Sequence, residues 1–209
     1  MKTEMLKGPD REPETRAWID DVPRNGMPVL WDVGANVGSF SVYAAKRGIR
    51  VVAVEPVPSN LYLLVKNLTL NNVQDDCIVL PVPLTDVIGL ETLTLSSFHF
   101  GAARHRFGKD RSYLGTELNG DITFRLSGCT MDWAVKQMSL PLPTHIKVDV
   151  DGIDDKVLYG AQECLESVDG ICCEMHFSDD RVNRLIQFLK ARGFGLTHRT
   201  RRNSFFARI

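Results

Sequence analysis

The chain has 209 residues, of which 44% are hydrophobic and 24% charged, with a formal net charge of −1. This balance is that of a globular protein, and a chain of this length can form a core without disulfides or metal ions. Disorder as the main state is excluded, and no run of about 18 apolar residues predicts a membrane span. We expect one domain.

Two further features bear on the cellular compartment. Residues 1–10 alternate basic and acidic side chains and contain no apolar stretch typical of a secretory signal. The five cysteines are odd in number, include no C-x-x-C pair and lie mostly in apolar segments. We therefore expect reduced, buried thiols and a cytoplasmic protein.

Strand and helix patterns alternate from residue 29 onward. Strands are predicted at 29–33, 51–54, 78–82, 93–95, 122–126, 146–150, 170–175, 194–196 and 205–207, with Pro81 placing the third near an edge. Helices are predicted at about 40–47, 58–68, 130–137, 156–165 and 182–191. This order predicts an α/β fold with a mostly parallel sheet, helices on both faces and a closing hairpin.

The predicted organisation is an N-terminal extension with a short helix over residues 1–28, followed by one domain over 29–209. Within that domain the polar stretch 96–120 is too long for a simple connection, and we interpret it as a substrate-facing loop. Residues 181–209 carry eight basic and no acidic side chains, which suits either an anionic partner or a solvated surface.

The sharpest motif is the turn Asp32-Val-Gly-Ala-Asn-Val-Gly38 between the first strand and the first helix. Gly34 and Gly38 allow a tight turn and a close approach to a ligand. The G-x-G-x-x-G fingerprint of dinucleotide binding is absent, because Asn36 and Ser39 occupy its second and third positions. An acidic residue before the first glycine suits a ligand that carries positive charge.

Two more acidic residues follow the next strands. Glu55 ends the second strand, where a carboxylate can accept hydrogen bonds from ribose hydroxyls. Asp86 follows the third strand and could accept a hydrogen bond from an adenine amino group. Because parallel strands end at the same edge of a sheet, Asp32, Glu55 and Asp86 predict one binding crevice.

With these motifs in order, the chain resembles the FkbM-type class I methyltransferases, which depend on S-adenosylmethionine. The resemblance runs from about residue 29 to the end and includes Glu55-Pro-x-Pro-x-Asn60, Leu84-Thr-Asp86, Thr130-Met-Asp132, His145-Ile-Lys-Val-Asp-Val-Asp-Gly152 and Glu174-Met-His176. It implies a Rossmann-like fold with a seven-stranded sheet. It also implies that Asp32, Gly34 and Asn36 surround the methionine part of the cofactor, that Glu55 holds the ribose, and that Asp86 lies beside the adenine.

Candidates for the chemical step lie at the ends of later strands. The strand period of two places Lys147 and Asp149 on one side, and likewise Glu174 and His176. Our hypothesis is that Asp149 and Glu174 orient or deprotonate the methyl acceptor and that His176 assists as a base. Two alternatives stay open: Asp149, Asp151 and Glu174 could hold Mg²⁺, or Lys147 and Asp149 could form an internal ion pair with His176 as a core histidine.

The expected acceptor is a hydroxyl of a sugar, a glycoconjugate or a small secondary metabolite, a preference that rests on the resemblance. An RNA methyltransferase that uses the basic C-terminal residues is an alternative. A cofactor-binding module without catalysis and a relative of the nucleotide-binding dehydrogenases are two others. No Pro-Pro tetrapeptide typical of base-amine methylation is present.

Overall fold

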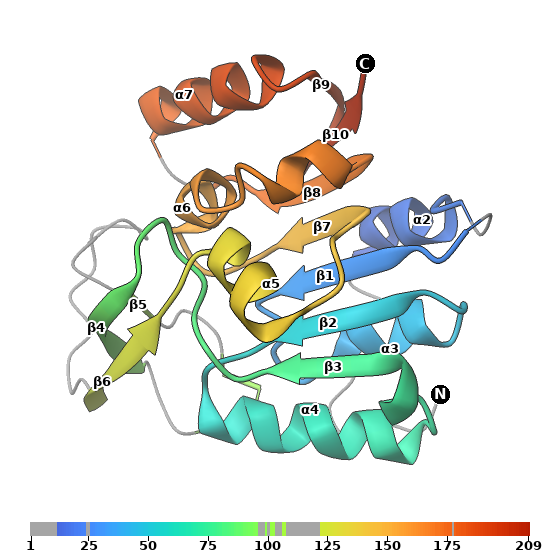
Figure 1. The fold of residues 1–209 in the computed structure, drawn as a ribbon, viewed down its shortest axis with the longest axis vertical. Coiled ribbons are helices and arrows are strands. Elements are labelled where there is room, and N and C mark those ends of the chain that lie inside the picture. Colours follow the sequence, from blue (N-terminus) through green and yellow to red (C-terminus); the bar gives the residue numbers. More distant parts are fainter. Residues whose placement is uncertain are drawn as a thin grey trace.

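The computed structural model describes residues 12–23, 26–95, 99, 101–102, 106–107, 122–176 and 178–209 (Figure 1). The interpretation of 96–120 as a substrate-facing loop lies largely outside the described residues. No helix in the described parts of the chain is long and apolar enough to cross a membrane. All five cysteines carry free thiols, and all except Cys77 are buried.

The main sheet has seven strands in the order β3-β2-β1-β7-β8-β10-β9. They are β1 (Val29–Val33), β2 (Arg50–Val54), β3 (Cys77–Leu80), β7 (His145–Val148), β8 (Gly170–Glu174), β9 (Phe194–Arg199) and β10 (Asn203–Arg208). Strands β1, β2, β3, β7 and β8 are parallel, whereas β10 is antiparallel to both of its neighbours. The predicted parallel sheet, closing hairpin and edge position of the third strand are confirmed.

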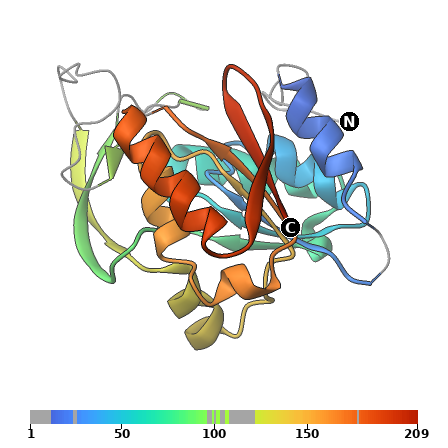
Figure 2. The same cartoon turned by 90° about the horizontal axis from the view of Figure 1, so that it is seen from above.

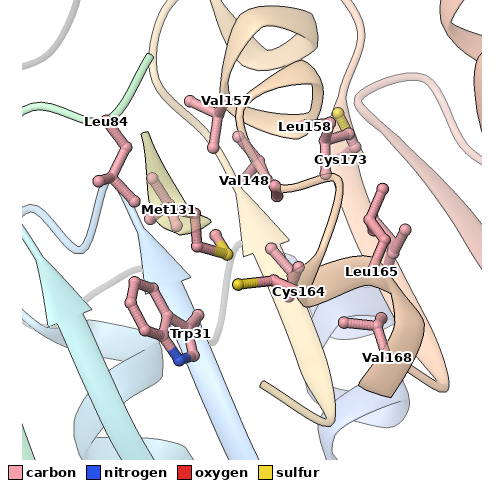
Figure 3. Close-up of a cluster of buried hydrophobic side chains, with 14 of the residues drawn as sticks. Trp31, Leu84, Met131, Val148, Val157, Leu158, Cys164, Leu165, Val168 and Cys173 are labelled. Atoms are coloured by element: carbon pink, nitrogen blue, oxygen red, sulfur yellow. The ribbon is translucent and has the colours of Figure 1, made fainter. Parts of the chain in front are cut away.

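Helices cover both faces of this sheet (Figure 2). One layer contains α2 (Pro13–Asp20), α3 (Ser39–Ala45) and α4 (Pro58–Leu70), and the other contains α5 (Met131–Met138), α6 (Asp154–Tyr159) and α7 (Asp179–Lys190). Alternate strand residues serve the two layers: Leu30 packs toward α3 and α4, whereas Trp31 packs toward α5 and α6. Figure 3 shows the second core, where Cys164 and Cys173 pack among apolar side chains.

A second, antiparallel sheet of three strands lies beside the ends of the main strands. It consists of β4 (Gly89–Leu95), β5 (Arg106–Phe107) and β6 (Ile122–Gly128), in the order β5-β4-β6. Its buried residues Leu93, Leu95 and Phe107 pack against Val57 and Ile153, which follow β2 and β7. The small sheet therefore covers the carboxyl end of the main sheet.

The single helix predicted over 156–165 is wrong, because the chain forms α6, then a turn, then a 3-10 helix at Cys164–Ser167. Gly160 ends α6 against another segment: a Cβ added there would lie 2.2 Å from the carbonyl oxygen of Thr85. The Asp132 carboxylate then accepts hydrogen bonds from the backbone N–H groups of Glu163 and Cys164, at 3.0 and 2.9 Å. A second short 3-10 helix, Gln74–Asp76, precedes β3.

Candidate active site

A pocket opens where β1, β2 and β7 end, beneath the small sheet. Strand β1 lies between β2 and β7, so the chain order reverses at this point, and ligands of open α/β sheets bind at such a reversal. The pocket's polar wall includes Asn36, Glu55, Asn60, Asp149 and Asp151. Its apolar wall includes Val57, Leu84, Leu93, Phe107 and Ile153.

The turn after β1 forms one side of the pocket, and its positive φ angles explain its composition. Gly34, Asn36 and Gly38 have φ of 83°, 52° and 84°. A Cβ at Gly34 would lie 1.9 Å from the Asp149 carbonyl oxygen, and one at Gly38 would lie 2.6 Å from Leu64 Cδ1. Gly34 does line the pocket, but backbone packing against the end of β7 already requires a glycine there.

Glu55 at the end of β2 is the buried acid of the pocket, with 4% of its surface exposed. Its Oε2 accepts a hydrogen bond from the backbone N–H of Asn36, and its Oε1 accepts one from that of Val57, both at 2.8 Å. Burial raises the pKa of Glu55 to about 7, although these two hydrogen bonds oppose the shift. Each oxygen retains a second lone pair for a ligand.

Asn60 and Ala102 form part of the pocket wall that our site prediction omitted. The Asn60 side chain accepts a hydrogen bond from the Gly101 N–H at 2.9 Å and donates one to the Ala102 carbonyl at 3.0 Å. The Asn36 side chain donates to the same carbonyl at 3.2 Å. The motif Glu55-Pro-x-Pro-x-Asn60 was the available signal for Asn60, whereas nothing in the sequence indicated Leu93 or Phe107.

Three predicted cofactor residues, Asp32, Gly38 and Asp86, do not line the pocket. Asp32 is buried beneath it, where its Oδ2 accepts a hydrogen bond from the Ser41 hydroxyl at 2.6 Å and its Oδ1 lies 3.3 Å from Lys147 Nζ. Asp86 is exposed, and its carboxylate accepts a hydrogen bond from the Thr85 hydroxyl at 3.0 Å. Pro83 and Leu84, which precede it, reach the pocket instead.

The three predicted catalytic residues are brought together. The Asp149 carboxylate lies close enough to Glu174 to raise the pKa of that carboxyl, and His176 Nδ1 lies 2.9 Å from Glu174 Oε1. Lys147 Nζ lies 3.5 Å from Asp149 Oδ2, so the internal ion pair exists beside this cluster rather than in place of it. Burial and then the negative charge of Asp149 raise the pKa of Glu174 to about 9.

The loop after β7 is held by acidic residues. Asp151 has φ of 55° and lines the pocket. The buried Asp154 carboxylate accepts hydrogen bonds from the Val150 and Gly152 N–H groups, at 3.2 and 3.1 Å, and burial raises its pKa to about 7. Arg181 of α7 donates to Asp155 and to the Gly152 carbonyl, both at 3.0 Å. Both contacts fix the loop between the pocket and α7.

Metal binding receives no support, since no group of three or more His, Cys, Asp or Glu side chains among the described residues is arranged to hold an ion. Some of the basic side chains near the C-terminus form hydrogen bonds within the fold. Arg208 donates to the Val168 carbonyl at 2.9 Å, and Arg192 donates to Gln162 at 2.8 Å. These contacts reduce the positive surface available to an anionic polymer.

Comparison with known proteins decides the family, because the model of the methyltransferase FkbM domain matches residues 32–196. The chain belongs to the FkbM methyltransferase family. The hexuronic acid methyltransferase AglP of Haloferax volcanii is 29% identical to the chain over 153 residues, which cover 73% of this chain and 57% of AglP. The predicted family and class I methyltransferase fold are confirmed.

Solved structures agree on the fold. The FkbM methyltransferase of Methylobacillus flagellatus matches with a TM-score of 0.59 at 15% identity, covering 87% of this chain and 43% of that one. TrmK of M. capricolum, solved with the cofactor product S-adenosylhomocysteine, matches with a TM-score of 0.52 at 8% identity, covering 92% and 66%. The chain spans about half the length of AglP and of the M. flagellatus methyltransferase.

Proposed function

We propose that this protein transfers a methyl group from S-adenosylmethionine to a hydroxyl oxygen of a sugar or glycoconjugate. The observation that carries the proposal is the juxtaposition of buried Glu55 with the Asp149–Glu174–His176 cluster around the reversal of the sheet. A relative that acts on hexuronic acid supports a glycan acceptor, and a neighbour in fold that binds S-adenosylhomocysteine supports the cofactor.

The residues present fit this cofactor. Each Glu55 oxygen has a lone pair beyond the one that a backbone N–H occupies, which suits the two hydroxyls of a ribose. The apolar wall formed by Val57, Leu93, Phe107 and Ile153 suits a flat aromatic base. Gly34 and Asn36 would lie against the methionine part, whereas the predicted Asp86–adenine contact stays a prediction. When bound, the cofactor supplies a methyl group on a positively charged sulfur.

The acceptor would bind beside Asp149, whose side chain is 36% exposed and forms part of the pocket wall. A hydroxyl held there can donate its hydrogen bond to the Asp149 carboxylate, which orients it and takes up its proton. Positioning of this kind makes the encounter of acceptor and methyl group effectively intramolecular. His176, through Glu174, extends the proton path from the pocket toward the partly exposed surface.

The cofactor arm of the proposal is tested by titration calorimetry with S-adenosylhomocysteine. Glu55→Gln keeps the shape but removes a charged acceptor, and we expect about 10- to 100-fold weaker binding. Because the pKa of Glu55 is raised to about 7, wild-type affinity should increase from pH 6 to pH 8, while the variant should stay level. Preference for NAD over S-adenosylhomocysteine would contradict the proposal.

The acceptor arm uses isotopically labelled methyl donor with uronic acids, neutral sugars and a metabolite extract. We expect one acceptor class to gain about 14 mass units plus the extra mass of the isotope per transferred methyl group, by mass spectrometry, with the label on oxygen. Asp149→Asn should abolish turnover while S-adenosylhomocysteine affinity stays within about threefold, because Asp149 acts on the acceptor. Unchanged turnover in that variant would remove Asp149 from the mechanism.

A further inference from the structure

Exposed arginines gather at the turn between β9 and β10, a part of the molecule that the proposed function has not yet used. Arg199 ends β9, and Arg201 and Arg202 lead into β10. All three residues are exposed. Arg202 faces α2, since its Nη1 lies 3.8 Å from Glu12 Oε1. No carboxylate among the described residues forms such an ion pair with Arg199 or Arg201, so their positive charge is available to a ligand.

Hydrogen bonds hold this turn in one shape against α2, and Figure 2 shows the β9–β10 hairpin extending beside that helix. The Thr200 N–H donates to the Asn203 carbonyl at 2.8 Å, and the Thr200 hydroxyl accepts from the Asn203 N–H at 3.0 Å. The buried Asn203 side chain donates to Glu12 Oε2 and to the Thr15 hydroxyl, both at 3.0 Å. A turn that is already fixed has less entropy to lose when a ligand binds.

The register of the main sheet relates the turn to the pocket. One row of paired residues crosses the carboxyl ends of five strands, and its first member lines the pocket. The row is Val33, Val148, Cys173, Ser204 and Arg199, from β1, β7, β8, β10 and β9. Neighbouring strands lie about 5 Å apart, so Arg199 is about 15 Å from the end of β7, where Asp149 follows. The arginines share an edge with Asp149 but lie too far away to contact the hydroxyl that reacts there.

The charge along this edge changes sign between the pocket and the turn. Glu55, Asp149 and Asp151 line the pocket, and no lysine or arginine of the described part of the chain does so. An anionic group of the acceptor is therefore repelled from the pocket and attracted to the turn.

We propose that the turn at Arg199 and Arg201 binds a carboxylate or phosphate group of the acceptor glycan while a hydroxyl of the same molecule enters the pocket. This inference rests on the proposed function and names its substrate class, an acidic glycan of at least two sugar units. A guanidinium group binds either anion through two parallel hydrogen bonds. Anchoring the glycan at the turn orients it, so that one hydroxyl rather than its neighbours reaches Asp149.

The test variant is Arg199→Gln combined with Arg201→Gln, which removes two exposed charges and keeps polar side chains. Arg50→Gln combined with Lys190→Gln is the matched control. Both control residues are exposed, and they lie away from this edge, at the start of β2 and at the end of α7. The two double variants change the net charge equally, so a difference between them reports where the charges lie.

The first measurement is binding without cofactor, by NMR titration of the protein. Trigalacturonic acid is compared with maltotriose, and maltose 1-phosphate with maltose, at about 50 and about 200 mM salt. We expect at least one acidic probe to bind about tenfold or more tightly than its neutral counterpart at the lower salt, and this advantage to shrink at the higher salt. The tighter acidic probe identifies the anion.

The variant at Arg199 and Arg201 should lose about tenfold in affinity for that acidic probe, and the control variant less than about twofold. Acidic and neutral probes that bind equally, or equal losses in the two double variants, overturn the proposal. An RNA tetranucleotide, which carries as many negative charges as trigalacturonate, is titrated in the same way. RNA that binds more tightly than both acidic probes and depends on the two arginines also overturns it, since the surface then binds nucleic acid.

The second measurement separates this inference from the proposed function, by following methyl transfer from labelled S-adenosylmethionine. With an acidic glycan as acceptor, we expect the variant at Arg199 and Arg201 to lose about tenfold in kcat/KM and the control variant to keep it. Transfer to a neutral glycan that the arginine variant leaves unchanged supports the proposed function and overturns this inference. Anion binding at the two arginines without transfer to these probes or to any glycan of a metabolite extract contradicts the proposed function and leaves the anion site in place.

Discussion

Gly34 shows how a single residue connects the fold to the pocket. Its missing Cβ lets the turn after β1 touch the backbone at the end of β7, and the same turn presents the Asn36 N–H to Glu55. The glycine thus determines the distance between the wall that carries Glu55 and the strand that carries Asp149.

We expect Gly34→Ala to lower both stability and cofactor affinity, because the added methyl would lie 1.9 Å from the Asp149 carbonyl oxygen and the backbone has φ of 83°. Gly48→Ala is the matched control, since Gly48 has φ of 77° with nothing within 4 Å of an added Cβ. Left-handed strain alone should cost about 1–2 kcal/mol of unfolding free energy in the control. Urea denaturation should show a larger loss at Gly34, and equal losses would contradict the packing argument.

At the scale of elements, the local patterns predicted the strands and helices whose signals are continuous in sequence. Buried runs predicted β1 and β2, and Pro81 indicated the edge position of β3. The break after α6 was missed, because it depends on Gly160 meeting the Thr85 carbonyl and on Asp132 capping the next turn. Those contacts join segments that are far apart in the chain, so the local sequence pattern could not predict them.

In the site too, features with a local sequence signal were predicted, and features that depend on contacts between distant segments were missed. Strand ends predicted a shared site for Glu55, Asp149, Glu174 and His176, because parallel strands bring their carboxyl ends to one edge. Glu55 and Asp149 do line one pocket, whereas Glu174 and His176 are not among its lining residues. The same rule placed Asp86 in the crevice, yet its side chain is exposed while Pro83 and Leu84 reach the pocket. The strands predicted at 93–95 and 122–126 exist as β4 and β6, but their pairing with β5 in a separate sheet could not be foreseen, since β5 has only two residues and carries no periodic signal.

The contact between α4 and the segment at 101–102 leads to a prediction at this scale. Asn60→Ala removes two hydrogen bonds that hold Gly101 and Ala102 against the pocket. We expect affinity for S-adenosylhomocysteine to fall about fivefold or more, by calorimetry, because a wall of the site loses its fixed position. Asn71→Ala, which removes a hydrogen bond at the other end of α4, should cost stability and leave affinity intact. Equal effects of both variants on affinity would contradict a role of Asn60 in the wall.

At the scale of the whole molecule, the main sheet brings several acidic side chains together at the carboxyl end of its strands and buries them from solvent. Burial is the leading cause of the raised pKa values of Glu55 and Asp154, each about 7, and of Glu174, about 9. The folded protein therefore holds protons that the unfolded chain releases at lower pH. Ionisation of Glu55, which the proposed cofactor binding uses, therefore costs the fold stability, a common compromise in active sites.

This arrangement predicts that stability falls as the solution becomes more alkaline. A carboxyl group whose pKa is higher in the folded state than in the unfolded chain adds to the free energy of unfolding. This contribution is complete at pH values below the unfolded pKa, and it is lost as the pH rises through the folded pKa. The pH range over which this stability is lost runs from 4.5 to about 7 for Glu55, from 3.8 to about 7 for Asp154, and from 4.5 to about 9 for Glu174. Each group loses at most about 1.4 kcal/mol per pH unit within its window. We expect Tm to fall on the order of 5 °C or more between pH 6 and pH 9 in calorimetric scans. Glu174→Gln should flatten the part above pH 7, since Glu174 is the one of these three carboxyl groups that still titrates there, and a wild-type Tm that rises over this range would contradict the buried-carboxyl account.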